Sequence, residues 1–391
     1  MQARDANTPE DSWRTRRREA RKKAFESEKS EELRQEKLVN SQMDEHCGTS
    51  RRANDRLAAL AGSTMLSDLR ACLPPDAFRR SDALAALAVL RSLSVVAALT
   101  LAGPWLPTPL YAALQGTAAV GLWVLAHDCG HGALFATAGL NDAVGWVLHS
   151  ALLVPYFTWR GSHRLHHART NHLTEGETHR PPLPDEPRLS LLLPPCCAAL
   201  LEMIARPLVG WPAYLLVGAT GRPGLLLHFR PCRAFRTCWR DVLLSDAGLA
   251  LTLAALWHVG RAAVKWYWGP LLVVNAWLVV ITYLQHTHAR LPHFDADWTW
   301  LKGAMEGTVD RPYVGVDWLH HHIGSSHVLH HLFPEVPCYR AVEATARLRA
   351  ALEPQGLYNY DGTGVLAALY ASSRRCRYVE PGKGPRLYKE D

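Results

Sequence analysis

The chain has 391 residues, of which 48% are apolar and 20% charged, and its net charge is +7. This composition excludes a mostly disordered protein, a collagen-like protein and a small disulfide scaffold. The nine cysteines form no CxxC pair, which argues against a zinc ribbon. Lys and Arg gather mainly near the start of the chain, so no nucleic-acid partner is expected. The 20 histidines are the unusual feature of the composition.

Residues 1–60 are rich in charge and poor in aliphatic side chains, with runs such as Arg16-Arg17-Arg18 and Arg21-Lys22-Lys23. We expect a solvated cytosolic tail that is disordered or transiently helical, and that either solubilises the protein or contacts anionic lipid headgroups. No apolar stretch of the kind found in a secretory signal lies near the start. Residues 61–391 are expected to form one domain.

The first long apolar region runs from Ser92 to Ala126, 35 residues without an Asp, Glu, Lys or Arg. A surface helix in water does not have this composition. Gly103–Pro109 contains three prolines and breaks the region, leaving about 20 apolar residues before the turn and about 18 after it, each near the length that spans a bilayer. We predict a transmembrane hairpin, with Arg91 inside the bundle or reaching toward the interface.

A second hairpin is predicted from Val242–Val259 and Gly269–Gln285, with Trp and Tyr crowding its turn as at a membrane interface. The predicted fold is therefore an all-α integral membrane protein with four transmembrane helices in two hairpins. The alternative is the core of a large soluble helical protein. Three further uncharged stretches are shorter or broken by Pro and Gly, and we expect them to be interfacial or half-buried: Ala143–Trp159, Leu189–Leu201 and Pro207–Gly221.

Eight histidines fall into three clusters with helical spacing. Residues three and four apart share one face of a helix, so each cluster presents its imidazoles to one point. Each hairpin returns the chain to the side it left, which places all three clusters on the same side of the membrane. The clusters are His127 with His131, then His163 with His166 and His167, and finally His327 with His330 and His331.

Eight imidazoles exceed what one zinc ion needs and are enough for two metal ions. Imidazole suits zinc, copper, iron and nickel, so the ligand type alone does not name the metal. A site beside an apolar bundle favours an apolar substrate, and attack on an unactivated C–H bond requires iron and dioxygen chemistry.

Together with eight further segments, the three clusters resemble the membrane fatty acyl desaturase family, specifically its methyl-end branch of delta-12 (oleate) and omega-3 desaturases. The resemblance covers roughly residues 64–385. The further segments are Leu73–Ser81, Gly210–Tyr214, Gly221–Pro223, Ser245–Gly248, Leu271–Asn275, Ile281–His288, Thr308–Arg311 and Tyr378–Pro381.

The resemblance implies a non-haem di-iron centre in a His-rich helical cap on the cytosolic face of the endoplasmic reticulum membrane. It implies electrons from cytochrome b5 and its NADH-dependent reductase, and O2-dependent insertion of a cis double bond into an acyl chain carried on phospholipid or CoA. Both termini would be cytosolic, as Arg79 and Arg80 before the first hairpin also favour. The eight clustered histidines would be catalytic iron ligands. A further ligand is placed at His286 in preference to His288.

Other polar residues are secondary candidates. His321, within the run His320–His322, is expected to contact a ligand rather than to be one. Four acidic residues would hold ligand imidazoles through the second ring nitrogen, or else be surface or helix-end charges: Asp128, Glu175, Glu177 and Asp310. Seven histidines fit no ligand spacing and are expected to serve packing or lie on the surface: His46, His149, His172, His179, His228, His258 and His293.

Regioselectivity rests on conflicting signals. Gly132 after the first cluster and Leu332-Phe333-Pro334 after the third look like omega-3 members, whereas the spacing from His320 to His327 and the segment Ala168–His172 look like delta-12 members. We predict delta-12 desaturation, with omega-3 (delta-15) desaturation, hydroxylation, conjugation or acetylenic bond formation as alternatives. The alternative from another class is a zinc-binding membrane receptor or transporter without redox chemistry. A receptor would need fewer ligands than the eight clustered histidines, and a transporter would need polar residues inside its membrane spans.

Overall fold

The computed structural model describes residues 63–218, 228–229, 239–382 and 384–390. Within these ranges the chain forms helices, turns, loops and isolated β-bridges but no strands, so the predicted all-α class is confirmed. The charged tail of residues 1–60, with His46, lies outside the described residues.

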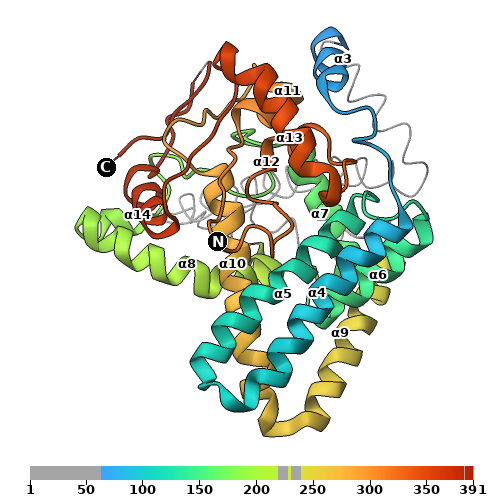
Figure 1. The fold of residues 1–391 in the computed structure, drawn as a ribbon. Coiled ribbons are helices and arrows are strands. Elements are labelled where there is room, and N and C mark those ends of the chain that lie inside the picture. Colours follow the sequence, from blue (N-terminus) through green and yellow to red (C-terminus); the bar gives the residue numbers. More distant parts are fainter. Residues whose placement is uncertain (1–62, 219–227, 230–238, 383, 391) are drawn as a thin grey trace, which may run out of the picture.

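Along the chain, two pairs of long apolar helices come before a final group of shorter helices (Figure 1). Short 3₁₀ or π turns occupy residues 103–105, 189–191, 260–262, 264–268 and 353–355. The α-helices are α3 (Ser63–Cys72), α4 (Asp82–Ala102), α5 (Thr108–Gly130), α6 (Ala138–Ala151), α7 (Tyr156–Ala168), α8 (Pro195–Val217), α9 (Trp239–Val259), α10 (Gly269–His286), α11 (Trp300–Glu306), α12 (His327–Leu332), α13 (Cys338–Leu352) and α14 (Val365–Arg375).

The first predicted hairpin is formed by α4 and α5. The Ser81 side chain caps α4 by accepting a hydrogen bond from the Leu84 amide at 3.3 Å. Near the turn, Gln115 Nε2 donates to Thr100 Oγ1 at 2.9 Å and ties the two helices together. The apolar window of α5 is 67% buried and that of α4 only 17%, so α5 is the central helix and α4 presents apolar side chains outward.

The second predicted pair, α9 and α10, is also present, but the two helices diverge from their turn (Figure 1). α10 packs against α5 and α8, while α9 packs against α6 and α7. The Ser245 hydroxyl of α9 accepts from the Phe157 amide at 3.1 Å, which fixes α9 to α7. In the turn, Lys265 Nζ donates to the Gly103 carbonyl at 3.0 Å and so links the two pairs at the end away from the histidines.

The structure corrects the expectation for α8. Two short segments broken by proline were predicted, but Pro195–Val217 is one helix that continues through Pro207 and Pro212. A proline costs about 3 kcal/mol relative to alanine inside an isolated helix. Packing against α10 and α14, with Trp211 and Tyr214 buried, offsets this cost. α8 is a fifth helix long and apolar enough to cross a membrane, but it runs across the direction of α4, α5, α9 and α10 (Figure 1).

α5 and α10 approach each other closely near the first turn of α10, at the end away from His286. A Cβ atom at Gly116 would lie 2.5 Å from the Pro270 carbonyl oxygen, so only glycine allows this separation. Trp277 Nε1 of α10 donates to Thr117 Oγ1 of α5 at 2.9 Å. From this contact both helices continue to the histidine end of the bundle, where His127 lies in the last turn of α5 and His286 ends α10.

α12 sits between two apolar cores because its six residues have two different faces. Val328, Leu329 and Leu332 pack with α3, α11 and α13 in the smaller core. The three histidines of α12 lie on the opposite face, toward the ends of α5 and α10. Burial of the apolar face therefore aims the imidazoles at the larger bundle.

Candidate metal centre

The nine histidines predicted as ligands converge at one place, although they come from four helices and the residue after one of them. Seven are buried, and His131 and His163 are half-buried. They are His127 and His131 from α5 and its C-terminal end, His163, His166 and His167 from α7, His286 from α10, and His327, His330 and His331 from α12.

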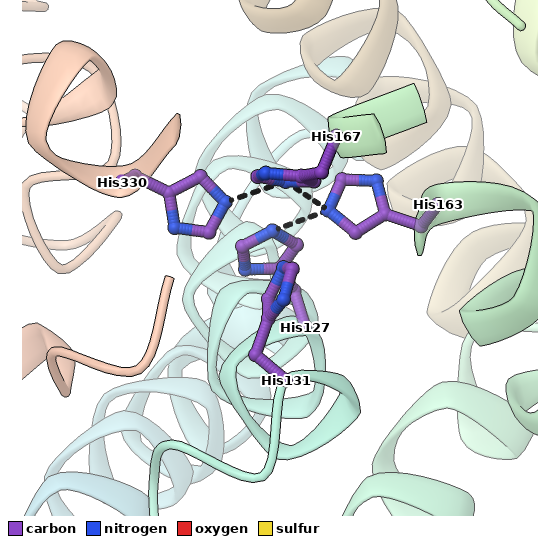
Figure 2. Close-up of side chains that lie close together, drawn as sticks. All are labelled: His127, His131, His163, His167 and His330. Atoms are coloured by element: carbon purple, nitrogen blue, oxygen red, sulfur yellow. Dashed lines mark hydrogen bonds between the residues drawn. The ribbon is translucent and has the colours of Figure 1, made fainter. Parts of the chain in front are cut away.

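Five of these side chains form a first set, which contains His127, His131, His163, His167 and His330 (Figure 2). Their ligand nitrogens lie within 4.8 Å of one another. The Nε2 atom of His163 lies 2.9 Å from that of His127 and 3.1 Å from that of His167. The Nε2 atom of His167 also lies 3.1 Å from that of His330.

The remaining four form a second set around His286. Ligand nitrogens of His166, His286 and His331 lie within 4.8 Å of one another. The Nε2 atom of His286 lies 3.1 Å from that of His166 and 2.9 Å from that of His327. The second set is therefore centred on the one histidine that belongs to no cluster.

Neighbouring histidines on α7 and on α12 are divided between the two sets. Successive residues of a helix point about 100° apart, so His166 and His167 turn toward different sets, as do His330 and His331. The rings of His167 and His331 stack with centroids 4.1 Å apart and bring the two sets into contact. The HxxHH spacing thus places adjacent imidazoles in two different sets.

Hydrogen bonds outside the cluster fix the tautomer of three imidazoles. His127 Nδ1 meets the Asp128 carboxylate at 3.3 Å, and His286 Nδ1 meets the Gly307 carbonyl at 3.3 Å. Both acceptors require Nδ1 to carry the proton, which leaves the Nε2 lone pair facing the cluster.

The tautomer of His331 is fixed in the same way, by the hydroxyl group of a threonine. The Thr170 hydroxyl donates its single proton to the His166 carbonyl at 2.8 Å, so it must accept from His331 Nδ1 at 3.1 Å. His331 Nε2 therefore presents a lone pair and has no hydrogen-bond partner among the described residues.

These residues fit a pair of bound metal ions. Two imidazole nitrogens, each about 2.1 Å from a metal and at right angles, lie about 3 Å apart, which matches the 2.9–3.1 Å contacts of both sets. Converging lone pairs repel one another without a cation between them. The donor set is imidazole throughout, which suits a transition metal.

Burial keeps the imidazoles of α7 and α12 neutral. Desolvation, and then the neighbouring imidazoles, hold the pKa of His163, His167 and His331 well below the ordinary value of 6.5. For His166, desolvation lowers the pKa to about 3. Neutral imidazole is the form that binds a metal, so this site is available near neutral pH.

The acidic candidates have different positions. Asp128 contacts the ligand candidate His127, and its other oxygen accepts from the Cys338 amide at 2.9 Å. Asp310 accepts from the Val328 amide at 2.7 Å and so fixes the start of α12, while burial raises its pKa to about 7. Glu175 pairs with Arg169 at 2.9 Å, and Glu177 accepts from the Tyr214 hydroxyl.

The structure places His321 against α4, outside both sets. Its ring nitrogens contact Arg91 Nη2 and Ser92 Oγ, each at 2.8 Å. His320 Nε2 contacts the Thr117 carbonyl at 3.0 Å, and His288 lies 3.5 Å from the Asp361 carboxylate. Among the described residues, none of these three histidines joins the metal-ligating groups.

Sequence reasoning missed several residues that hold the ligands. Thr170 follows His166 by four residues, so helical spacing contained a signal for it. Thr178 Oγ1 lies 2.7 Å from His166 Nδ1, a contact that helical spacing does not indicate. The indole of Trp159 stacks on His163 with centroids 4.7 Å apart and restricts that ring. His179, expected only to pack, stacks on His286 at 5.9 Å.

Comparisons with known proteins identify the family. The profile described as fatty acid desaturase matches residues 103–361. A delta-12 acyl-lipid desaturase of Punica granatum is 39% identical over 341 residues, covering 82% of this chain and 87% of the relative. A delta-12 fatty-acid desaturase of Arabidopsis thaliana is 37% identical over 340 residues, covering 81% and 88%. An acyl-lipid (9+3)-(E)-desaturase of Dimorphotheca sinuata is 35% identical, covering 82% and 89%.

The match to the family profile extends over more than half of the chain and contains all nine converging histidines. Its two ends lie in the turn after α4 and beyond α13. The chain therefore belongs to the fatty acid desaturase family.

Proposed function

We propose that the chain is a delta-12 acyl-lipid desaturase, which converts an oleoyl chain into a linoleoyl chain. The convergence of nine histidines in two sets at one end of an apolar bundle carries this proposal. The names of the relatives in Punica granatum and Arabidopsis thaliana favour the delta-12 position over the omega-3 position. The reaction removes two hydrogens from adjacent carbons and, with O2, two electrons and two protons, yields one double bond and two water molecules.

The metal proposed for both positions is iron. The five histidines of the first set would hold one ion, and His166, His286, His327 and His331 would hold the other. When bound, the irons supply the oxygen-dependent oxidation of a C–H bond that no side chain can carry out. The catalytic role of the histidines is thus that of ligands.

The protein's own contribution is to keep the ligands neutral, oriented and shielded from water. Burial disfavours the imidazolium forms, so little reorganisation precedes metal binding. Asp128, Thr170 and the Gly307 carbonyl hold three rings through Nδ1. Such partners are worth about 10–100-fold in metal affinity or activity.

We further propose the topology and the cellular setting. α4, α5, α9 and α10 cross the membrane as two pairs, and α8 lies along the interface, in keeping with its crosswise direction in Figure 1. The histidine end, both termini and the charged tail of residues 1–60 would face the cytosol from the endoplasmic reticulum membrane, with residues 61–391 as the desaturase domain. Cytochrome b5 and its NADH-dependent reductase would supply the electrons, and phospholipid or CoA would carry the acyl chain.

A fatty-acid profile tests the activity. The full chain is expressed in a microbial host that contains oleate and cytochrome b5 but no polyunsaturated acids. New linoleate is the expected result, and its double-bond geometry is determined because one relative is named for an E product. Alpha-linolenate formed only from added linoleate would establish the omega-3 alternative, and a hydroxylated product would establish the hydroxylase alternative.

Metal analysis of the purified chain tests the centre separately. Two iron ions per chain are expected. A stable content of zinc together with no oxidised product in any host would support the receptor alternative. The His166→Ala variant is expected to lose the product while it still inserts into the membrane, because it removes a ligand and no apolar surface.

A further inference from the structure

A cavity of about 270 Å³ lies beside α4. The residues that line it are distant in the chain from the ligand candidates, apart from the histidines of α12, which follow the turn that contains His321. Three elements form its walls. Ala88 and Arg91 come from α4, His321 and His322 from the turn before α12, and Tyr339 and Val342 from α13.

The cavity lies near the end of α4 that adjoins the histidine cap. Arg91 follows the first residue of α4 by nine positions, which corresponds to about 13.5 Å along the helix. Its side chain leans back toward the helix N-terminus, as all helical side chains do. At that N-terminus the Tyr339 hydroxyl accepts from the Ser81 amide at 2.8 Å. Because α13 and the turn before α12 belong to the cap and reach α4 at Ala88 and Arg91, we place the membrane surface along α4 at this level.

Arg91 is held in place but not neutralised. Its Nη2 donates to the Trp318 carbonyl at 3.1 Å and to His321 Nδ1 at 2.8 Å. Within the described ranges, its Nε and Nη1 groups meet no acceptor and no carboxylate forms an ion pair with it. Three N–H donors and a full positive charge therefore remain for a ligand.

The turn that carries His321 is fixed in a shape that favours this arrangement. Because His321 Nδ1 accepts from Arg91, its Nε2–H donates to Ser92 Oγ at 2.8 Å. His321 and His322 have φ angles of +49° and +63°, in the left-handed region that non-glycine residues rarely adopt. The packing around the turn must maintain this backbone, and it keeps the guanidinium at the cavity wall.

The surroundings favour an anion. Among the described residues, no carboxylate lines the cavity. His322 pairs with Asp317 at 3.1 Å, and Asp82 at the start of α4 is already bound to the Thr137 amide and hydroxyl. Both carboxylates are therefore engaged elsewhere, and the unpaired charge at the cavity is positive.

We propose that this cavity binds the phosphate group of a membrane phospholipid, with Arg91 as its charged ligand. A guanidinium offers paired N–H donors that match phosphate oxygens. The acyl chains of such a lipid would run toward the membrane centre along the exposed leucines that follow Arg91 on α4, where Leu93 is 41% and Leu101 is 74% exposed. None of the nine histidines of the two sets lines this cavity.

The test measures lipid binding by native mass spectrometry of the full chain in detergent. The probes are dimyristoylphosphatidylcholine and dimyristoylglycerol, which share saturated acyl chains that the proposed reaction does not use and differ by the phosphate headgroup. The wild-type chain is expected to prefer the phospholipid by about tenfold or more, the contribution of one charge-assisted contact of this kind. The Arg91→Gln variant is expected to lose the preference and Arg91→Lys to keep part of it.

Two further variants make the result specific. Arg240→Gln removes the same charge from the exposed start of α9 and should leave the preference unchanged. Val342→Glu places a carboxylate at the cavity from a side chain that is 55% exposed, without altering α4, and should abolish the preference.

Three outcomes would overturn the proposal. The first is an unchanged preference for the phospholipid in both Arg91→Gln and Val342→Glu. The second is an equal loss of that preference in Arg240→Gln. The third is complete displacement of the lipid by millimolar inorganic phosphate, which would assign the site to a free anion. Binding is measured without turnover, so a failure of the desaturase assignment leaves this result unaffected.

Discussion

The Nε2 atoms of His166 and His286 lie 3.1 Å apart, although 120 residues separate them in the chain. His286 ends α10, and it also meets His327 of α12 at 2.9 Å. One residue at the end of a membrane-length helix therefore joins two clusters into the second set of histidines. The placement of that set depends on how α10 packs against α5.

The first prediction concerns His286. His286→Ala is expected to remove the metal of the second set and to reduce desaturation by more than the roughly 10–100-fold typical of residues that only orient ligands. Iron content and product yield check this. His288→Ala is the matched control, since that side chain lies beside Asp361, and it should retain both. Full iron content in His286→Ala would contradict the assignment.

The second prediction concerns Thr170, which fixes the tautomer of His331. Thr170→Val keeps the shape of the side chain but removes the acceptor, so metal affinity should fall about 10–100-fold. Thr170→Ser restores the hydroxyl and should restore most of the affinity. Competition with a chelator measures both variants, and equal affinities for Val and Ser would show that the hydroxyl has no role.

The third prediction concerns Gly116, where α5 and α10 approach most closely. An added Cβ would lie 2.5 Å from both the Pro270 carbonyl oxygen and Val273 Cβ, so the helices must separate. Gly116→Ala should lower the free energy of unfolding by about 1–3 kcal/mol and also reduce activity, because α10 carries His286.

Gly139→Ala is the control for that variant, because a Cβ at Gly139 meets no atom within 4 Å. Replacing an exposed helical glycine by alanine stabilises a helix by about 0.5–1 kcal/mol. Thermal unfolding in detergent compares the two variants. A Gly116→Ala protein as stable as Gly139→Ala would refute the close contact.

The fourth prediction concerns acid sensitivity at the C-terminal segment. Burial lowers the pKa of His293 from 6.5 to about 4. Between these values the unfolded segment binds a proton that the folded one does not, so stability falls as pH drops from 6.5 toward 4, by up to about 1.4 kcal/mol per pH unit. His293 pairs through its backbone with Arg386 at 2.7 Å and packs against Tyr388.

Hydrogen exchange of residues 384–390 measures this effect. Exchange should accelerate as the pH is lowered below 6.5, after correction for the intrinsic pH dependence of exchange. His293→Phe cannot titrate and should show a smaller acceleration. The same acceleration in both proteins would exclude His293 as the cause.

Much of the fold was predictable because its signals are local. A span needs about 20 apolar residues, and α4, α5, α9 and α10 were each found from length and charge. α8 was not, because Pro207 and Pro212 carry a strong local signal for a break. Burial of Trp211 and Tyr214 against other helices outweighs that signal, and no local pattern contains this packing.

The sequence by itself determined the family, the apolar helices and the nine histidines, since helical spacing and hydropathy act between residues close in the chain. Only the tertiary structure decided how these histidines divide into two sets, because the division depends on the directions in which α7 and α12 meet the ends of α5 and α10. It also decided that His321 joins Arg91 rather than a metal set. This contact joins residues 230 positions apart, and only packed helices bring such residues together.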